Sequence, residues 1–220
     1  MIYGVILAGG NSSRFNGTTH KSLYKIWEKE IIKYNIDEMS TVVDEIIIVV
    51  KEKYLKDFKR VYSNCKYVIQ EDSLGTADAL KYAMSIINQD GDVIVMNADT
   101  FMLKPYLGEL YKYHKENKYA ATVLGIDSVV NASALVEKND NFYIDESIKE
   151  YTLKNSGIYI FDKKVVEKNI DKIDKVNGEY YITKIFDFID NKGIYKCYDN
   201  ELISINTQDE LKELEEKFKR

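Results

Sequence analysis

The sequence predicts an α/β fold in which a mixed, mostly parallel sheet is flanked by helices. Two observations predict it. Short apolar runs such as 45–50 are typical of buried strands, and the segments between them carry apolar residues at helical spacing. Their alternation is typical of right-handed crossover units. In such sheets ligands bind beyond the carboxyl ends of the strands, so the loops after the strands are the expected place for functional residues.

The first half of the chain alternates regularly. Segment 2–8 is apolar and too short for a core helix, and 45–50 repeats that character, so both are predicted to be strands. Further strands are expected at 66–69 and 92–97, and helices at 30–39, around Leu55, Phe58 and Tyr62, and at 76–87.

The second half is less regular, with short strands expected at 120–126, 134–138, 142–145 and 157–161 and helices at 179–190 and 208–218. The chain has 220 residues, 45% of them hydrophobic, which is enough for one sizeable core. Pro105 is the only proline, and no repeat or low-complexity linker divides the chain. We therefore predict a single domain over residues 1–220.

Charge and composition exclude several classes of partner. The formal charge is −5 and the basic residues are scattered, so no nucleic-acid partner is expected. The longest apolar run, 46–50, is too short for a bilayer, and no basic leader follows Met1, so no membrane partner and a cytoplasmic location are expected. Cys65 and Cys197 match no metal or redox spacing and are expected to be reduced.

The run LAGGNSSRF at 7–15 directly follows the first predicted strand. Its first residues, Leu7, Ala8, Gly9 and Gly10, are expected to bind a nucleotide, because glycines let the backbone approach a ligand and expose N–H groups to phosphate oxygens. Gly-Gly after a strand is also a common turn, and that interpretation stays open.

Two basic residues favour a phosphate-binding role for this loop over a simple turn. Arg14 and Lys21 supply positive charge that a transferring phosphorus needs, and we predict both as catalytic. The Walker pattern is excluded because His20, not glycine, precedes Lys21-Ser22. The dinucleotide fingerprint is excluded because no third glycine follows at its required place.

A second segment, QEDSLGTADAL at 70–80, places an amide, a glycine and a helix start after another strand. The Gln70 side chain offers both a donor and an acceptor, which suits a pyrimidine such as uracil, and Gly75 leaves room for a base or ribose. Thr76 is expected to cap the helix. The alternative is that Gly75-Thr76 is only a turn and an N-cap.

Together these motifs resemble the sugar-1-phosphate nucleotidyltransferases, most closely the uridylyltransferase domain of N-acetylglucosamine-1-phosphate uridylyltransferases. The resemblance covers nearly the whole chain and implies a Rossmann-like, GT-A-like fold. LAGGNSSRF with Lys21 resembles the nucleotide signature loop of that family, and Gln70 with LGTADA resembles its base-recognition stretch.

The resemblance also implies a metal site and a sugar site. Asp99 in NADT and Asn206 in SIN resemble the family's magnesium ligands, and Mg²⁺ prefers such hard oxygen donors. Sugar-binding residues are implied at Glu146, Asn155, Tyr181 and Thr183. Without the resemblance, an acid such as Asp99 can also cap a turn, and an asparagine such as Asn206, before Thr207 and a helix, is more commonly a capping or turn residue.

Three departures from the family concern the substrate. His20 stands where the family usually has proline, Ser133 stands where the closest relatives usually have glycine beside the sugar, and NADT replaces their GD-containing turn. NADT also resembles the NGDT of heptose-1-phosphate guanylyltransferases, whereas Gln70 fits uracil or thymine better than guanine.

The expected activity is joining a nucleoside triphosphate, UTP above others, to a sugar 1-phosphate with Mg²⁺, giving a nucleotide sugar and pyrophosphate. Alternatives are another base or acceptor, such as heptose 1-phosphate or a phosphocholine-like compound. A GT-A-like glycosyltransferase and a noncatalytic nucleotide-sugar sensor also stay open. The Asn97-Ala98-Asp99 sequence lacks the Asp-x-Asp motif usual in the former, and Arg14, Lys21 and Asp99 are residues that the latter would more naturally have lost.

Overall fold

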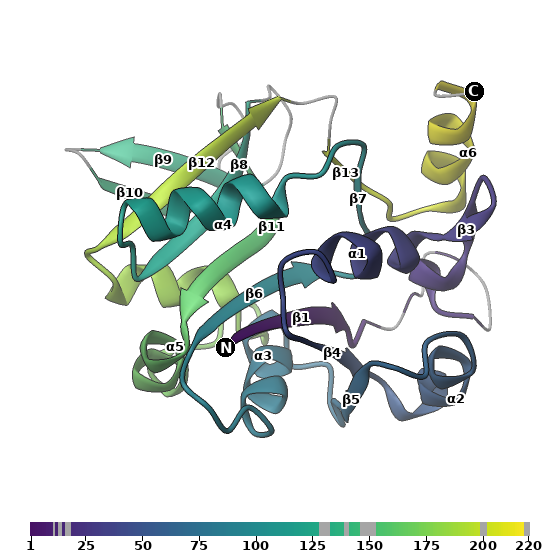
Figure 1. The fold of residues 1–220 in the computed structure, drawn as a ribbon, viewed down its shortest axis with the longest axis horizontal. Coiled ribbons are helices and arrows are strands. Elements are labelled where there is room, and N and C mark those ends of the chain that lie inside the picture. Colours follow the sequence, from purple (N-terminus) through teal and green to yellow (C-terminus); the bar gives the residue numbers. More distant parts are fainter. Residues whose placement is uncertain are drawn as a thin grey trace.

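A computed structural model describes residues 1–10, 12, 15, 19–127, 133–138, 141–145, 153–198 and 202–217. Within these residues a nine-stranded mixed sheet carries helices on both faces, as the sequence predicts (Figure 1). No helix of the described residues is long and apolar enough to cross a membrane.

One side of the sheet is parallel, in the order β5-β4-β1-β6. These strands are β1 (Ile2–Ala8), β4 (Glu45–Val50), β5 (Lys66–Ile69) and β6 (Asp92–Asn97). All four therefore end at the same edge, which is where loops from distant parts of the sequence meet.

The other side is mixed. β11 (Leu153–Asp162) runs antiparallel to β6 and to β8 (Ala121–Asp127), and β12 (Lys192–Tyr198) lies parallel to β8. The hairpin of β9 (Ala134–Lys138) and β10 (Asn141–Asp145) extends the sheet next to β11.

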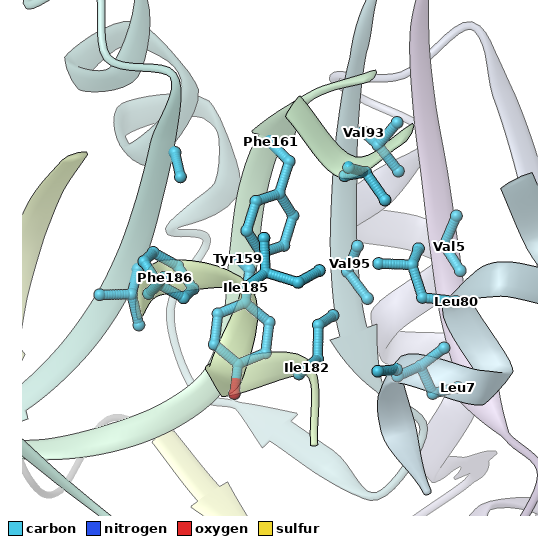
Figure 2. Close-up of a cluster of buried hydrophobic side chains, with 14 of the residues drawn as sticks. Val5, Leu7, Leu80, Val93, Val95, Tyr159, Phe161, Ile182, Ile185 and Phe186 are labelled. Carbon is cyan, nitrogen blue, oxygen red and sulfur yellow. The ribbon is translucent and has the colours of Figure 1, made fainter. Parts of the chain in front are cut away.

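Two cores lie on the two faces of the sheet because alternate side chains of a strand point in opposite directions. On one face Val5 and Leu7 of β1 pack with Leu80 of α3 (Thr76–Met84) and with Ile182 of the 3-10 helix η4 (Ile182–Phe188), as Figure 2 shows. Helix α5 (Lys163–Asn169) and the short η3 (Ile170–Lys172) follow on this side.

On the opposite face, Ile6 packs with Ile32, Phe58 and Leu110. These come from α1 (Ile31–Met39), α2 (Glu52–Val61) and α4 (Leu107–Glu116), respectively. The sheet is thereby sandwiched between two helical layers (Figure 1).

A third, smaller cluster joins the beginning and the end of the chain. Phe15, Ile26 and Phe101 pack there with Leu211 and Leu214 of α6 (Gln208–Lys217). Small elements frame it: η2 (Lys21–Leu23), β2 (Lys25–Ile26), β3 (Lys29–Glu30), and the antiparallel pair β7 (Thr100–Met102) and β13 (Leu202–Ser204). This cluster brings residue 206 next to the end of β6.

Two predicted helices differ from the structure. The helix expected at 76–87 ends at Met84, and the one expected at 179–190 is the 3-10 helix η4, which begins only at Ile182. Tyr180 explains the late start, because its N–H donates to Leu74 O (2.7 Å) and its carbonyl accepts from Ala77 N (2.9 Å). These bonds hold Tyr180 against the turn before α3 and outside the helix.

Candidate active site

A cleft of about 440 Å³ opens at the carboxyl ends of β1, β5 and β6. It is lined by Leu7, Gly9, Gly10, His20, Lys21, Gln70, Ser73, Gly75, Thr76, Ala79, Asn97, Ala98, Asp99, Glu179 and Asn206. A cleft of this size at this edge of a parallel sheet is the expected place for a nucleotide-sized ligand.

The cleft brings together nine of the residues predicted from the sequence. They are Leu7, Gly9, Gly10, Lys21, Gln70, Gly75, Thr76, Asp99 and Asn206. Sequence reasoning assigned no role to the other lining residues. Two of these could have been found from the sequence. Glu179 lies in GEYYIT with two predicted sugar residues, and Ser73 lies inside the predicted base stretch.

The loop after β1 approaches the base stretch closely. A Cβ on Gly9 would lie 1.9 Å from Gln70 Oε1, so a larger residue would require this buried side chain to move. Ser73 Oγ donates to Gly9 O (3.2 Å), and the N–H of Lys21 donates to Ser12 Oγ (3.1 Å). The two loops and the start of η2 are therefore fixed to one another.

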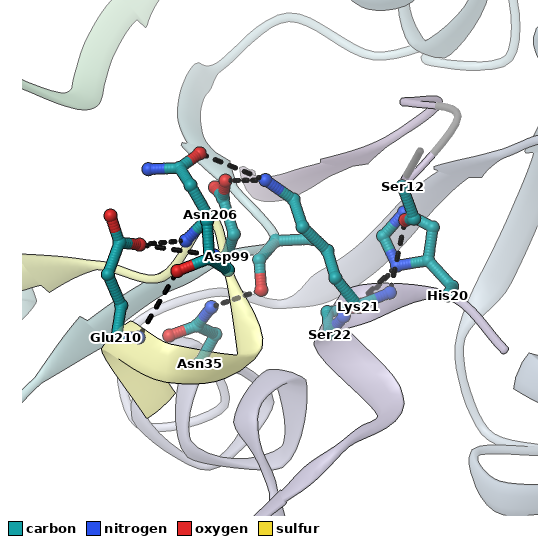
Figure 3. Close-up of polar contacts among 10 residues, drawn as sticks. Ser12, His20, Lys21, Ser22, Asn35, Asp99, Asn206 and Glu210 are labelled. Atoms are coloured by element: carbon teal, nitrogen blue, oxygen red, sulfur yellow. Dashed lines mark hydrogen bonds and ion pairs between the residues drawn. The ribbon is translucent and has the colours of Figure 1, made fainter. Parts of the chain in front are cut away.

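Lys21 supplies the positive charge among the described residues that line the cleft. Its side chain lies between the side-chain oxygens of Asp99 and Asn206. Its ammonium group forms an ion pair with Asp99 Oδ2 and donates to Asn206 Oδ1 (3.3 Å), as Figure 3 shows. Side-chain exposure is 20% for Lys21 and 16% for Asp99, so the charges are partly shielded from water. A carboxylate and an amide oxygen thus already coordinate one cation.

Asn206 does not cap the helix that follows it. Thr207 Oγ1 accepts from Glu210 N (3.1 Å), and Glu210 Oε2 accepts from the N–H groups of Asn206 (2.6 Å) and Thr207 (3.2 Å) (Figure 3). This is a capping box with Thr207 as the N-cap. The Asn206 side chain is thereby left for the cleft.

His20 is buried next to Lys21 and is neutral. It is 1% exposed, and its Nδ1 accepts from Ser22 N (3.2 Å) at the start of η2. Burial, reinforced by the charges of Lys21 and Lys53, lowers the pKa of His20 to about 3. The ring packs edge-on against Tyr54, with a centroid distance of 5.1 Å.

The predicted base stretch has the expected order of a strand, a turn and a helix, but two details differ from the prediction. Gly75, not Thr76, is the N-cap of α3; Thr76 is the first helical residue, and its hydroxyl accepts from Ile182 N (2.9 Å). Gln70 does not offer both ends of its amide, because Nε2 already donates to Asp78 Oδ2 (2.6 Å) and to Gly75 O (3.3 Å). Through this bond Thr76 connects the start of α3 to the start of η4. The two starts are neighbours because Tyr180 is bonded to the turn before α3.

The remaining predicted residues lie away from the described lining. The Ala8 side chain is buried in the core on the α1 face. Asn155 on β11 has local partners: Nδ2 donates to Tyr159 OH (2.8 Å), and Oδ1 accepts from Gly157 N (3.1 Å). Tyr181 is half-buried just before η4, and Thr183 is buried within it. Their roles, like that of Ala8, stay predictions.

Arg14 and Glu146 lie outside the described residues. Their predicted roles, at the transferring phosphate and at the sugar, respectively, rest on the sequence alone.

Comparison with known proteins identifies the family of this chain. The family model of the MobA-like NTP transferase domain matches residues 4–149. The bifunctional protein GlmU of Clostridioides difficile (strain 630) is 31% identical over 245 residues, covering 98% of this chain and 51% of that protein. GlmU of Alkaliphilus metalliredigens (strain QYMF) is 29% identical over 238 residues, covering 98% and 52%. The chain thus spans about half the length of these relatives.

A solved structure confirms the fold. A Bacillus anthracis protein described as a glucose-1-phosphate thymidylyltransferase, crystallised with sucrose, superposes with a TM-score of 0.83. The match covers 98% of this chain and 94% of that one at 18% identity. The Rossmann-like fold and the resemblance to sugar nucleotidyltransferases are confirmed, and the chain belongs to the nucleotidyltransferase family of MobA-like NTP transferase domains.

Proposed function

We propose that this protein joins a nucleoside triphosphate, with UTP favoured, to a sugar 1-phosphate and releases pyrophosphate. The observation that carries the proposal is that the Gly9-Gly10 loop, the Lys21 ammonium and the oxygens of Asp99 and Asn206 line one cleft with Gln70. A phosphate cradle, a cation, a pair of hard oxygen ligands and a base-reading amide are the parts that nucleotidyl transfer needs.

The nucleotide would lie across the carboxyl ends of the central strands. The base would contact Gln70 and Gly75, which line one part of the cleft, while the phosphates would lie along Gly9 and Gly10. Gly10 has open space at its Cβ position, with no atom within 4 Å, so its backbone is accessible to a ligand.

The reaction would be an in-line displacement. An oxygen of the sugar 1-phosphate attacks the α-phosphorus, forming the new P–O bond as the bond from the α-phosphorus to the pyrophosphate oxygen breaks. The attacking phosphate is ionised at neutral pH, so no general base is required. Catalysis then reduces to positioning and to stabilising charge, for which Lys21 and, from the sequence, Arg14 are proposed.

Asp99 and Asn206 fit the Mg²⁺ that the family implies. Their two oxygens already meet at one cation, the Lys21 ammonium, and carboxylate and amide oxygens are suitable ligands for a hard metal. When bound, Mg²⁺ would neutralise phosphate charge. Lys21 would then turn from Asp99 to the phosphates.

The sugar is proposed to bind beside the mixed part of the sheet. Glu146, Asn155, Tyr181 and Thr183 are the residues that the family resemblance suggests for it. Glu179, two residues before Tyr181, lines the cleft, so this segment is the part of the proposed sugar site that lies nearest the cleft.

Pyrophosphate release tests the proposal. We would assay UTP, dTTP, CTP, GTP and ATP with Mg²⁺, each with N-acetylglucosamine 1-phosphate, glucose 1-phosphate and other phosphorylated acceptors. Release should require both substrates and fall at least a hundredfold in Lys21→Ala, since a transition-state charge contact is removed. Lys25→Ala is the matched control, because Lys25 is an exposed lysine on β2 outside the cleft lining and should retain activity.

Other outcomes would identify other functions. Transfer or hydrolysis of a nucleotide sugar without pyrophosphate would identify a glycosyltransferase. Binding of a nucleotide sugar with no turnover of any pair would identify a sensor.

A further inference from the structure

The amide of Gln70 is held in one orientation by groups that only accept hydrogen bonds. Gln70 follows β5, is 2% exposed, and donates from Nε2 to Asp78 Oδ2 (2.6 Å) and to Gly75 O (3.3 Å). A carboxylate and a backbone carbonyl cannot donate, so both must face the amino group. The orientation of the amide is therefore fixed by chemistry as well as by shape.

The amino group has no hydrogen left for a ligand. An amide nitrogen carries two hydrogens, and Asp78 and Gly75 take one each. The carbonyl oxygen points the other way, toward Gly9, where a Cβ would lie 1.9 Å from it. A ligand in the cleft therefore meets Gln70 as an acceptor.

Asp78 exerts this control from outside the cleft. It is the third residue of α3, it is half-buried, and it lines a neighbouring cavity of about 390 Å³ with Lys81, Asp171 and Tyr180 rather than the nucleotide cleft. Its carboxylate contacts Gln70 without lining the nucleotide cleft. The contact through which Asp78 can affect a bound nucleotide is therefore its hydrogen bond to Gln70.

We propose that Asp78 is a positioning residue that makes Gln70 an obligate acceptor and so selects nucleobases with a hydrogen on the pairing-edge ring nitrogen. Uracil and thymine carry that hydrogen on N3 and guanine on N1, whereas cytosine and adenine present a lone pair there. A lone pair facing the Gln70 oxygen would leave two acceptors opposed and desolvated, which is costly in a buried site. The inference rests on the proposed function and specifies its nucleotide.

Matched nucleotide pairs test the proposal. For wild type, kcat/KM for UTP should exceed that for CTP, and GTP should exceed ATP if purines are accepted. In Asp78→Ala the UTP:CTP ratio should fall at least tenfold, because the Gln70 amide can then turn over and donate. In Asp78→Asn the fall should be smaller, because an amide at 78 can hold either end of Gln70. Each ratio is taken on one sample and does not depend on the folded fraction.

Asp171→Ala is the control for lost charge. Asp171 lines the same neighbouring cavity and pairs with Lys81, but it does not touch Gln70. Its UTP:CTP ratio should stay within twofold of wild type. In a Gln70→Leu background, adding Asp78→Ala should change the ratio no further, because Asp78 acts only through Gln70. A merely structural role at the helix start would not give that pattern.

Binding separates failure of this inference from failure of the proposed function. If wild type releases no pyrophosphate with any pair, the transfer reaction is wrong, and calorimetric affinities for UTP and CTP test the inference alone. Preference for CTP, binding of neither nucleotide, or an unchanged UTP:CTP ratio in Asp78→Ala would each overturn it. A lowered ratio in Asp78→Ala with an unchanged one in Asp171→Ala would support it.

Discussion

The Lys21 ammonium lies where the proposed metal would bind. It contacts Asp99 Oδ2 and Asn206 Oδ1, the two oxygens proposed as ligands, and the pair is partly shielded from water. A divalent ion entering this place must displace the ammonium group and tolerate it nearby, which costs several kcal/mol at intermediate dielectric. Phosphates supply Lys21 with another partner. Metal binding should therefore be weak until a nucleotide is present.

We expect Lys21→Met to bind Mn²⁺ about tenfold or more tightly than wild type when no nucleotide is present, because the competing charge is gone. Electron paramagnetic resonance of free Mn²⁺ measures this without any turnover. Lys25→Met, which removes an exposed lysine outside the cleft lining, should match wild type, and adding Asp99→Asn should cancel the gain. Equal affinity in wild type and Lys21→Met would contradict the competition.

His20 gives the protein a sensitivity to acid. Its pKa is lowered to about 3 by burial first and by Lys21 and Lys53 next, against 6.5 for the ordinary group. Between these two pH values the unfolded chain binds a proton that the folded protein does not, so acidification lowers the free energy of unfolding across that window. Above pH 6.5 this contribution is absent.

Replacing His20 should remove that dependence. From pH 7.5 to 5.0 the free energy of unfolding of wild type should fall by about 2 kcal/mol more than that of His20→Asn, at 1.4 kcal/mol per pH unit below 6.5. Asparagine can still accept from Ser22 N at the start of η2, so the cap is retained. Urea unfolding at both pH values measures the difference, and parallel loss in the two proteins would argue against a buried neutral His20.

Among the elements, regular periodicity predicted more than irregular connections did. The strands 45–50 and 92–97 lie as expected because continuous apolar runs match fully buried parallel strands. A helix was predicted over 179–190, whereas the 3-10 helix η4 begins only at Ile182 because Tyr180 binds the backbone of the Leu74–Ala77 turn. These bonds join residues about 100 positions apart in the sequence, so the late start of η4 cannot be predicted from the local sequence.

The cleft shows the same division. Gly9, Lys21 and Gln70 were identified because glycine, cation and amide follow strands in recognisable motifs. The hydrogen-bond direction at Gln70 was not predictable, since it depends on Asp78 and on the fold of the turn. Residue types can be read from a motif, but which end of an amide faces the ligand cannot.

Gly75 holds the turn that carries the proposed base site. Its φ of +105° is a conformation that other residues rarely adopt, and a Cβ there would lie 2.5 Å from Tyr180 O and 2.7 Å from Tyr180 N. Because these are backbone atoms, a change of side-chain rotamer cannot relieve the overlap. Gly75→Ala must therefore push α3 and the segment before η4 apart.

We expect Gly75→Ala to lower the free energy of unfolding by about 2 to 3 kcal/mol through strain and steric overlap. Gly108→Ala in α4 is the control, because nothing lies within 4 Å of its Cβ position. That change should be neutral or stabilise by up to about 1 kcal/mol. Chemical denaturation of both variants decides, and equal stabilities would show that the turn tolerates a side chain.

For the molecule as a whole, the third cluster connects the two ends of the described chain. Trp27, the only tryptophan, lies beside Phe101 with ring centroids 5.8 Å apart, and its backbone N–H donates to Glu215 Oε1 of α6 (3.2 Å). Because α6 begins two residues after Asn206, the packing that holds α6 also places a proposed metal ligand. The cleft is thus completed by long-range contacts.

If residues 1–220 form one domain, as predicted, Trp27 fluorescence and far-ultraviolet circular dichroism should give coincident urea transitions. Leu214→Ala should shift both together by about 2 to 4 kcal/mol, since Leu214 is 4% exposed in the third cluster. Glu213→Ala, an exposed neighbour on the same helix, should shift neither by more than about 0.5 kcal/mol. A fluorescence transition that precedes the loss of circular dichroism would mean that α6 and its cluster unfold separately. Asn206 would then leave the cleft while the central sheet stays folded.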